Sequence, residues 1–175
     1  MLGCKHCRVE LVWVDAGMNV SAWTADSIAD ENCTAVGYAG ASITCRNAVW
    51  SSARGQDFGY SMRAPFVSEN VFAFSAYDDA ENFTKSLRER WSACSERHFV
   101  EQDDQPINWS VGPVTENAGL LSISATKADQ TAWVVQHAVT WRRNVVIDVA
   151  VSVLDPKADS AEKMTNDIAS RVPPE

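Results

Sequence analysis

The chain contains few groups of side chains that could carry out a reaction. Cys94 and His98 lie one helical turn apart, so a thiol and an imidazole base could meet there. Cys94, however, falls on the apolar stripe of its predicted helix, where a thiol faces the core and is inert. Cys4 and Cys7 have redox or metal spacing, but no strand precedes them and His6 supplies only a third metal ligand. Because the common hydrolase, metalloprotease and phosphate-loop motifs are also absent from the sequence, we expect a non-catalytic chain without cofactors or metals.

Small polar side chains form a more informative pattern. If Leu121, Ile123 and Ala125 face the core, the hydroxyl groups between them face the other way. A solvent-facing strand usually carries Lys, Glu or Arg, whereas short hydroxyl and amide groups suit a concave surface that water or a ligand occupies. We predict a ligand cleft on this polar face, and a plain solvated sheet face is the alternative. The predicted ligand-binding residues are Ser122, Ser124, Thr126, Gln136, Thr140, Asp148 and Ser152.

Two ionisable residues in the same region need separate interpretation. His137 lies on the apolar face of its predicted strand, between positions that carry tryptophan. We interpret it as a core histidine satisfied by one hydrogen bond rather than as a proton switch. Asp148 with a hydroxyl neighbour would be the starting point for a small hydrolase, a hypothesis that we rank below ligand binding.

A predicted β-hairpin between Thr131 and Leu154 positions most of these residues. Apolar and polar residues alternate with period two on both sides of a turn, which is typical of strands with one buried face. A three-residue loop at 142–144, with Asn144 at positive φ, would pair Trp141 with Val145. In that register the apolar sets of both strands share one face. The other face then carries Gln136, Thr140, Asp148 and Ser152.

Two amphipathic helices accompany the strands. The first begins at Asp78, and its apolar stripe is formed by Ala80, Phe83, Leu87, Trp91 and Cys94. The second runs from Asp159 to about Val172, with a capping box predicted at each start. Strands are predicted at 71–77, 107–114 and 119–126, besides the hairpin and a strand-turn-strand at 48–62. Short connections favour antiparallel pairing.

The pattern therefore predicts one α+β domain over residues 31–173. We expect an antiparallel sheet of about five to six strands with two main helices packed on one face. Residues 1–30 are predicted to form an N-terminal arm, with one short strand at most, at Val9–Val14.

Composition limits the partners. The 175 residues carry a net charge of −8, which argues against a nucleic-acid partner because such binding needs a concentrated basic surface. The sequence contains no apolar run of the length that spans a membrane. It opens with Met1-Leu2-Gly3-Cys4, similar to the end of a bacterial lipoprotein signal, so an N-terminal lipid anchor is the only form of membrane contact that we expect. Five cysteines leave at least one unpaired or paired between molecules.

Four segments in order resemble a known family, the PknH-like extracellular sensor domain. This domain occurs as the outer part of a mycobacterial receptor Ser/Thr kinase and in related mycobacterial lipoproteins. The resemblance covers about residues 30–173 and rests on the order and spacing of the segments. They are Asn32-Cys33, Trp91-Ser92-Ala93-Cys94, Asn144-Val145-Val146-Ile147-Asp148-Val149 and the final helix Ala161 to Val172 with Ile168-Ala169-Ser170-Arg171.

The resemblance implies an exported, membrane-tethered domain with an antiparallel sheet, flanking helices and a cleft for an unidentified ligand. It also implies a disulfide between Cys33 and Cys94, which would stabilise the fold by roughly 4 kcal/mol. Members of the family usually have a second disulfide, one cysteine of which lies near the end of the last long strand. This chain differs, because the corresponding residues 150–153 contain no cysteine. Cys45 has no family counterpart; it is free, or it pairs with Cys4 or Cys7.

The sequence thus favours an extracytoplasmic, non-catalytic sensor-type domain of a lipoprotein or receptor, either membrane-associated or secreted. Its expected partner is an unidentified small molecule or cell-envelope component bound in a polar cleft. The alternative is a protein-interaction module in the cell envelope, which a broad apolar surface patch would favour.

Overall fold

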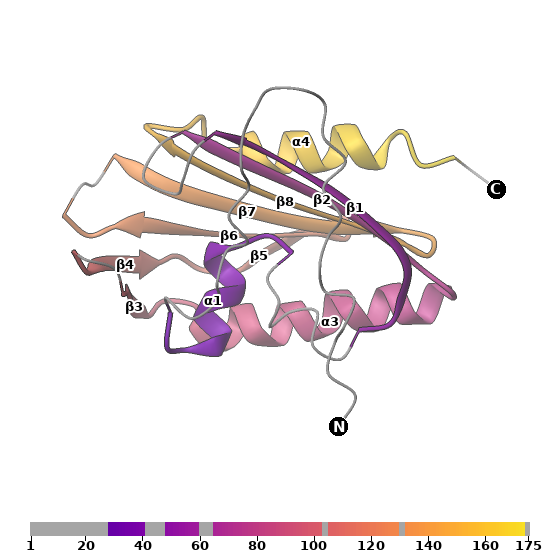
Figure 1. The fold of residues 1–175 in the computed structure, drawn as a ribbon, viewed down its shortest axis with the longest axis horizontal. Helices are drawn as coiled ribbons and strands as arrows, with labels where there is room; N and C mark the ends of the chain where they lie inside the picture. Colours follow the sequence, from indigo (N-terminus) through magenta and orange to yellow (C-terminus); the bar gives the residue numbers. More distant parts are fainter. Residues whose placement is uncertain (1–27, 41–47, 60–64, 103–104, 130–131, 174–175) are drawn as a thin grey trace.

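The computed structural model of the chain describes residues 28–40, 48–59, 65–102, 105–129 and 132–173 (Figure 1). The predicted strand at 9–14 and the cysteines at positions 4, 7 and 45 lie outside these residues. None of the helices in the described part of the chain is both long and apolar enough to cross a membrane.

The described residues form an eight-stranded antiparallel sheet, larger than the five to six strands expected. The strand order is β1-β2-β8-β7-β6-β4-β3, and β5 pairs with β6. The short strands β3 and β5 were missed because three or four residues are too few to show an alternation. The strands are β1 (Trp50–Gly59), β2 (Phe66–Phe74), β3 (His98–Glu101), β4 (Ile107–Val111), β5 (Thr115–Asn117), β6 (Leu120–Lys127), β7 (Trp133–Arg142) and β8 (Val145–Leu154).

The helices cover both faces of the sheet, so the expectation of two helices on one face is wrong. Helices α1 (Glu31–Gly37) and α3 (Tyr77–Cys94) lie on one side, which we call the α3 face (Figure 1). Helix α4 (Ser160–Ala169) lies on the opposite side, the α4 face. The central strands β7 and β8 are buried on both faces and are therefore covered on both sides. Each face has its own core cluster.

The register of the β7–β8 hairpin differs from the expectation by one residue. Arg142 pairs with Val145, which leaves a two-residue loop of Arg143 and Asn144. The positive φ, 57°, is at Arg143. Asn144 instead holds the end of β2, because its side-chain amide donates to the Phe74 carbonyl. A one-residue slip moves every side chain of β8 to the other face of the sheet.

Helix α3 agrees closely with the prediction, and its apolar stripe is buried against the sheet. The Phe83 ring lies 5.6 Å from that of Phe72, and the Trp91 indole donates to the Ala35 carbonyl of α1 at 2.8 Å. Neither predicted capping box forms: α3 is preceded by Ala76, and the Asp159 side chain makes no cap bond at the start of α4. Apolar packing of the stripe therefore positions α3 without side-chain capping.

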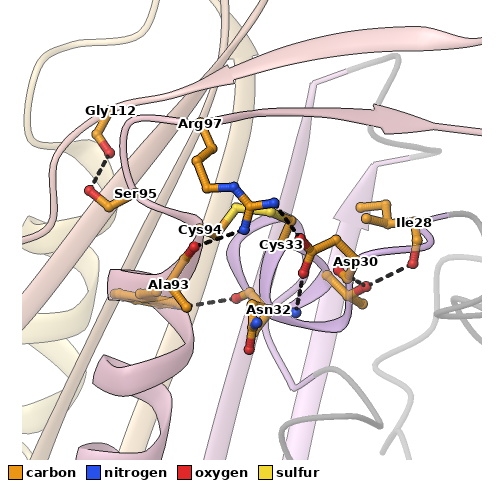
Figure 2. Close-up of a disulfide and its surroundings, with 12 residues drawn as sticks. Ile28, Asp30, Asn32, Cys33, Ala93, Cys94, Ser95, Arg97 and Gly112 are labelled. Atoms are coloured by element: carbon orange, nitrogen blue, oxygen red, sulfur yellow. Dashed lines mark hydrogen bonds and ion pairs between the residues drawn. A yellow bond between two sulfur atoms is a disulfide. The ribbon is translucent and has the colours of Figure 1, made fainter.

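The predicted Cys33–Cys94 disulfide is present and joins α1 to the last residue of α3 (Figure 2). The Cα atoms of the two cysteines lie 5.2 Å apart. Beside it, the Arg97 guanidinium pairs with Asp30 at 2.9 Å and donates to the Ala93 carbonyl at 2.9 Å. Asp30 also caps α1 by accepting from the Asn32 backbone amide. The bridge and this network fix the short α1 on the α3 face.

Candidate functional site: an acidic cleft on the α4 face

A cleft of about 500 Å³ opens on the α4 face, between strands β6 and β7 and the segment 155–162. This volume lies within the range of small-molecule sites. Successive residues of a strand point to opposite faces, so every second residue of β6 reaches the cleft. Four of the predicted ligand-binding residues line it: Ser122, Ser124, Thr126 and Gln136.

Two hydroxyl groups of the cleft make no hydrogen bond within the part of the chain that the structure describes. Ser124 and Thr126 are half-buried, and no described residue hydrogen-bonds to either side chain. Ser122 is engaged, because its hydroxyl donates to the Glu162 carboxylate at 2.6 Å and lies 2.7 Å from the Thr115 hydroxyl. Each free hydroxyl offers one donor and two acceptor sites, so the two residues can bind a polar ligand or ordered water.

Gln136 builds the cleft by holding α4 in place. Its amide nitrogen donates to the Lys157 carbonyl at 2.8 Å, and its amide oxygen accepts from the Ala161 backbone amide at 3.3 Å. Both partners lie at the start of α4 or just before it. A buried glutamine with both ends engaged fixes the distance between β7 and the helix, and with it the width of the cleft.

Three carboxylates surround the cleft, and sequence reasoning missed all of them as site residues. Asp155, Asp159 and Glu162 line it, whereas no lysine or arginine is among the described residues that do so. Asp159 pairs with the exposed Lys163 at 2.9 Å. Asp155 is exposed, and no described residue pairs with its carboxylate. The sequence signal was three acidic residues spaced from the end of the last strand into the first turn of the last helix, but nothing in the sequence located them beside β6.

The other three predicted site residues lie elsewhere. Thr140 is on the α4 face but buried, and its hydroxyl donates to the Gly119 carbonyl at 3.0 Å. The corrected register puts Asp148 and Ser152 on the α3 face, where Ser152 accepts from the Trp133 indole at 3.1 Å. The expectation of one continuous polar face is therefore wrong. Ligand binding by the four residues that do line the cleft stays a prediction.

The same register brings His137 and Asp148 together in the core. Each side chain is 1% exposed, and His137 Nε2 lies 2.5 Å from Asp148 Oδ1. His137 Nδ1 lies 3.0 Å from the Val36 carbonyl oxygen, and Gly40 donates its backbone amide to Asp148 at 2.8 Å. A carbonyl only accepts, so Nδ1 is the donor to Val36, and Nε2 makes the hydrogen bond to the Asp148 side chain.

This pair joins the end of α1 to the two central strands. His137 makes two polar contacts where one was expected, and its ring also lies 4.6 Å from that of Trp91. The pair is enclosed by the protein, so Asp148 is not open to a substrate. The hydrolase hypothesis therefore has no support from this residue.

Comparison with known proteins identifies the family. The model of the PknH-like extracellular domain matches residues 13–171. The chain belongs to the PknH-like extracellular domain family. Serine/threonine-protein kinase PknH of Mycobacterium bovis is 26% identical over 113 residues, which are 64% of this chain and 18% of the kinase. PknH of Mycobacterium tuberculosis is 26% identical over 113 residues, 17% of its length. The chain thus matches only a small part of these relatives.

A solved structure shows the same fold. The crystal structure of the extracellular domain of PknH from Mycobacterium tuberculosis superimposes with a TM-score of 0.73 at 18% identity. The match covers 81% of this chain and 74% of that one. The resemblance noted from the sequence is therefore confirmed, and so is the antiparallel sheet with flanking helices in a single-domain fold.

Exposed apolar side chains of this PknH-like domain come from separate parts of the fold. Among the described residues, the large ones are Val49, Phe58, Tyr77, Val100 and Leu154. They belong to β1 and the residue before it, the start of α3, β3 and the end of β8. Scattered apolar residues are normal on a protein surface and give no particular support to a protein-docking face.

Proposed function

We propose that this PknH-like domain is an extracytoplasmic, non-catalytic sensor-type domain that binds a small ligand in the cleft on the α4 face. The observation that supports this proposal is a cleft of about 500 Å³, whose β6 floor presents the hydroxyls of Ser124 and Thr126, to which no described residue hydrogen-bonds. A preformed concave site with a few convergent polar groups is the usual form of a small-molecule site. Membership of a family of extracellular domains supports the location.

The disulfide adds independent support for an oxidising compartment. Disulfides such as Cys33–Cys94 persist outside the cytoplasm, where thiols are not kept reduced. The bridge also removes Cys94 from any role as a nucleophile. The buried His137–Asp148 pair is likewise engaged in holding α1. The side chains best suited to acid–base chemistry thus serve the scaffold, which favours binding over catalysis.

The position of α4 suggests how ligand binding is coupled to a change that a partner protein can recognise. One wall of the cleft is the start of α4, and Gln136 and the Ser122–Glu162 hydrogen bond tie this wall to the sheet. A ligand that contacts both β6 and α4 would favour one position of the helix over others. In a membrane-tethered or secreted protein, a partner could recognise that position.

A blocked cleft tests the proposal. Thr126→Phe places a large ring in the cleft, whereas Asn108→Phe adds the same ring to an exposed position of β4 on the same sheet face, outside the cleft. Soluble polar small molecules are screened for their effect on the melting temperature of wild type and both variants. We expect hits that stabilise wild type and Asn108→Phe but not Thr126→Phe. Hits that stabilise all three proteins equally would contradict the proposal.

A further inference from the structure

We infer that the cleft selects a small organic cation that carries hydroxyl groups, of the amino-sugar or amino-alcohol class. The inference rests on the proposed ligand-binding function and adds to it the chemistry of the ligand. It follows from three features of the lining: its charge, its free hydroxyl groups and its apolar wall.

The charge of the lining is one-sided. Asp155, Asp159 and Glu162 contribute carboxylates, and Lys163 is the cation paired with one of them. The Lys163–Asp159 pair is exposed, with 67% and 45% of the two side chains accessible, so screening by water weakens it. The Asp155 carboxylate pairs with no described residue, although the Asp155 backbone amide donates to the Ala132 carbonyl. The cleft therefore attracts a positive group and disfavours an anion.

The start of α4 offsets this charge only in part. A helix N-terminus carries about half a positive elementary charge and can bind anions through free backbone amides. Here the Ala161 amide donates to Gln136, and the Ser160 amide donates to the Lys157 carbonyl at 3.3 Å. Three carboxylates outweigh about half a charge. The helix end therefore does not turn the cleft into an anion site.

The two free hydroxyls define the uncharged part of the ligand. Ser124 and Thr126 are two residues apart on β6, so both point to the cleft side about 7 Å apart along the strand. Groups that both donate and accept are matched best by ligand hydroxyls, which do the same. Spacing of this order suits a ring or short chain that carries several hydroxyl groups.

The remaining lining supplies apolar contact and limits the size. Pro113, Val134 and Pro156 contribute apolar surface that can pack against the C–H groups of such a ligand. A volume of about 500 Å³ admits a one- or two-ring molecule. A bare metal ion fits less well, because the described residues hold no group of three His, Cys, Asp or Glu side chains placed to ligate one.

Three closely matched sugars test the inference. Glucosamine carries the ammonium group, N-acetylglucosamine keeps the ring but removes the charge, and glucuronic acid carries a carboxylate. Backbone amide shifts are followed at about pH 6, where a sugar amine, with a pKa near that of an α-amino group, is protonated. We expect shifts in β6, β7 and the start of α4, with the affinity order glucosamine, N-acetylglucosamine, glucuronic acid.

Charge-neutralising variants make the test specific. Asp155→Asn and Glu162→Gln should each weaken glucosamine binding by about threefold to fivefold more than they weaken N-acetylglucosamine binding, as expected for the loss of a partly exposed ion pair. The control Asp167→Asn makes the same change in net charge on an exposed residue of α4 outside the cleft. It should change neither affinity beyond the general effect of charge.

Each other outcome overturns the inference in a recognisable way. Equal or tighter binding of N-acetylglucosamine or glucuronic acid in the cleft would refute the cationic preference and leave the ligand-binding proposal intact. Glucosamine shifts that lie outside the cleft, or no shifts with any of the three sugars, would refute the ligand class. The blocked-cleft screen above then decides separately whether the cleft binds small molecules at all.

Discussion

The buried His137–Asp148 pair gives the sharpest test of how the fold is held together. We consider His137→Leu, Asp148→Leu and the double variant, which replaces both polar groups by apolar ones. In wild type the two side chains are 1% exposed and 2.5 Å apart, and each has a second partner on or just beyond α1. Removal of one partner leaves the other buried without its counterpart, which costs about 3–5 kcal/mol.

The double variant should cost much less than the sum of the single variants. The two single changes together predict a loss of about 6–10 kcal/mol if they act independently. In the double variant no titratable side chain is left at this site, and the remaining penalty comes from the Val36 carbonyl and the Gly40 amide, about 1–3 kcal/mol each. We therefore expect a loss of about 2–6 kcal/mol and a coupling energy of about 4 kcal/mol, the difference between the two ranges.

Urea unfolding followed by tryptophan fluorescence measures these free energies, since Trp91 packs against His137. His98→Leu, at an exposed position, is the control and should change stability by less than about 0.5 kcal/mol. If a leucine variant does not fold, Asp148→Asn, which keeps a hydrogen-bonding side chain, replaces it in the cycle. Additive effects, with a coupling energy below about 0.5 kcal/mol, would refute the pairing and the hairpin register that produces it.

Two further predictions concern covalent and acid–base stability. A Cys33→Ala/Cys94→Ala variant should lose about 4 kcal/mol of unfolding free energy in urea, because the bridge closes a loop with a sequence separation of 61. A loss below about 1 kcal/mol would show that the fold does not depend on the bridge. Burial raises the pKa of the Asp57 carboxyl above 3.8, and a hydrogen bond from Ser68 lowers it in part. Ionisation of the Asp57 carboxyl therefore opposes folding once the pH exceeds 3.8. In thermal melts, the stability of Asp57→Asn relative to wild type should increase between about pH 3 and pH 7. A difference in stability that does not change with pH would contradict this.

The parts of the fold that could be predicted are those with a single buried face. Helix α3 was predicted because its stripe repeats at three- and four-residue steps. The hydroxyls of β6 were placed on the correct face because Leu121, Ile123 and Ala125 alternate cleanly with them. Both patterns indicate which side of the element faces the core, so the spacing of neighbouring residues was sufficient to predict it.

The hairpin register could not be fixed by the same reasoning. In β8 both Ile147 and Val149 on one face and Val146 and Ala150 on the other are buried. Apolar side chains on both faces fit either a two-residue or a three-residue loop, and the choice decides where Asp148 lies. The nearly continuous apolar run of β8 was itself a signal of cover on both sides, which would have placed α4 on its own face.

The acidic wall of the cleft was missed for a different reason. Asp155, Asp159 and Glu162 follow the last strand, and only the packing of α4 on β7 brings them beside β6. Such a juxtaposition depends on long-range topology, which alternation and helical spacing do not encode. The predicted serine and threonine residues supplied half of the cleft, and the helix on the unexpected face supplied the other half.

The most direct test of the central claim is an amide-shift map of the labelled wild-type domain titrated with small-molecule fractions of a mycobacterial cell envelope. The account predicts saturable shifts in the β6 and β7 residues that line the cleft and in the first turn of α4, with little change around the Cys33–Cys94 bridge. Saturable shifts confined to the α3 face or to the sheet edges would contradict it.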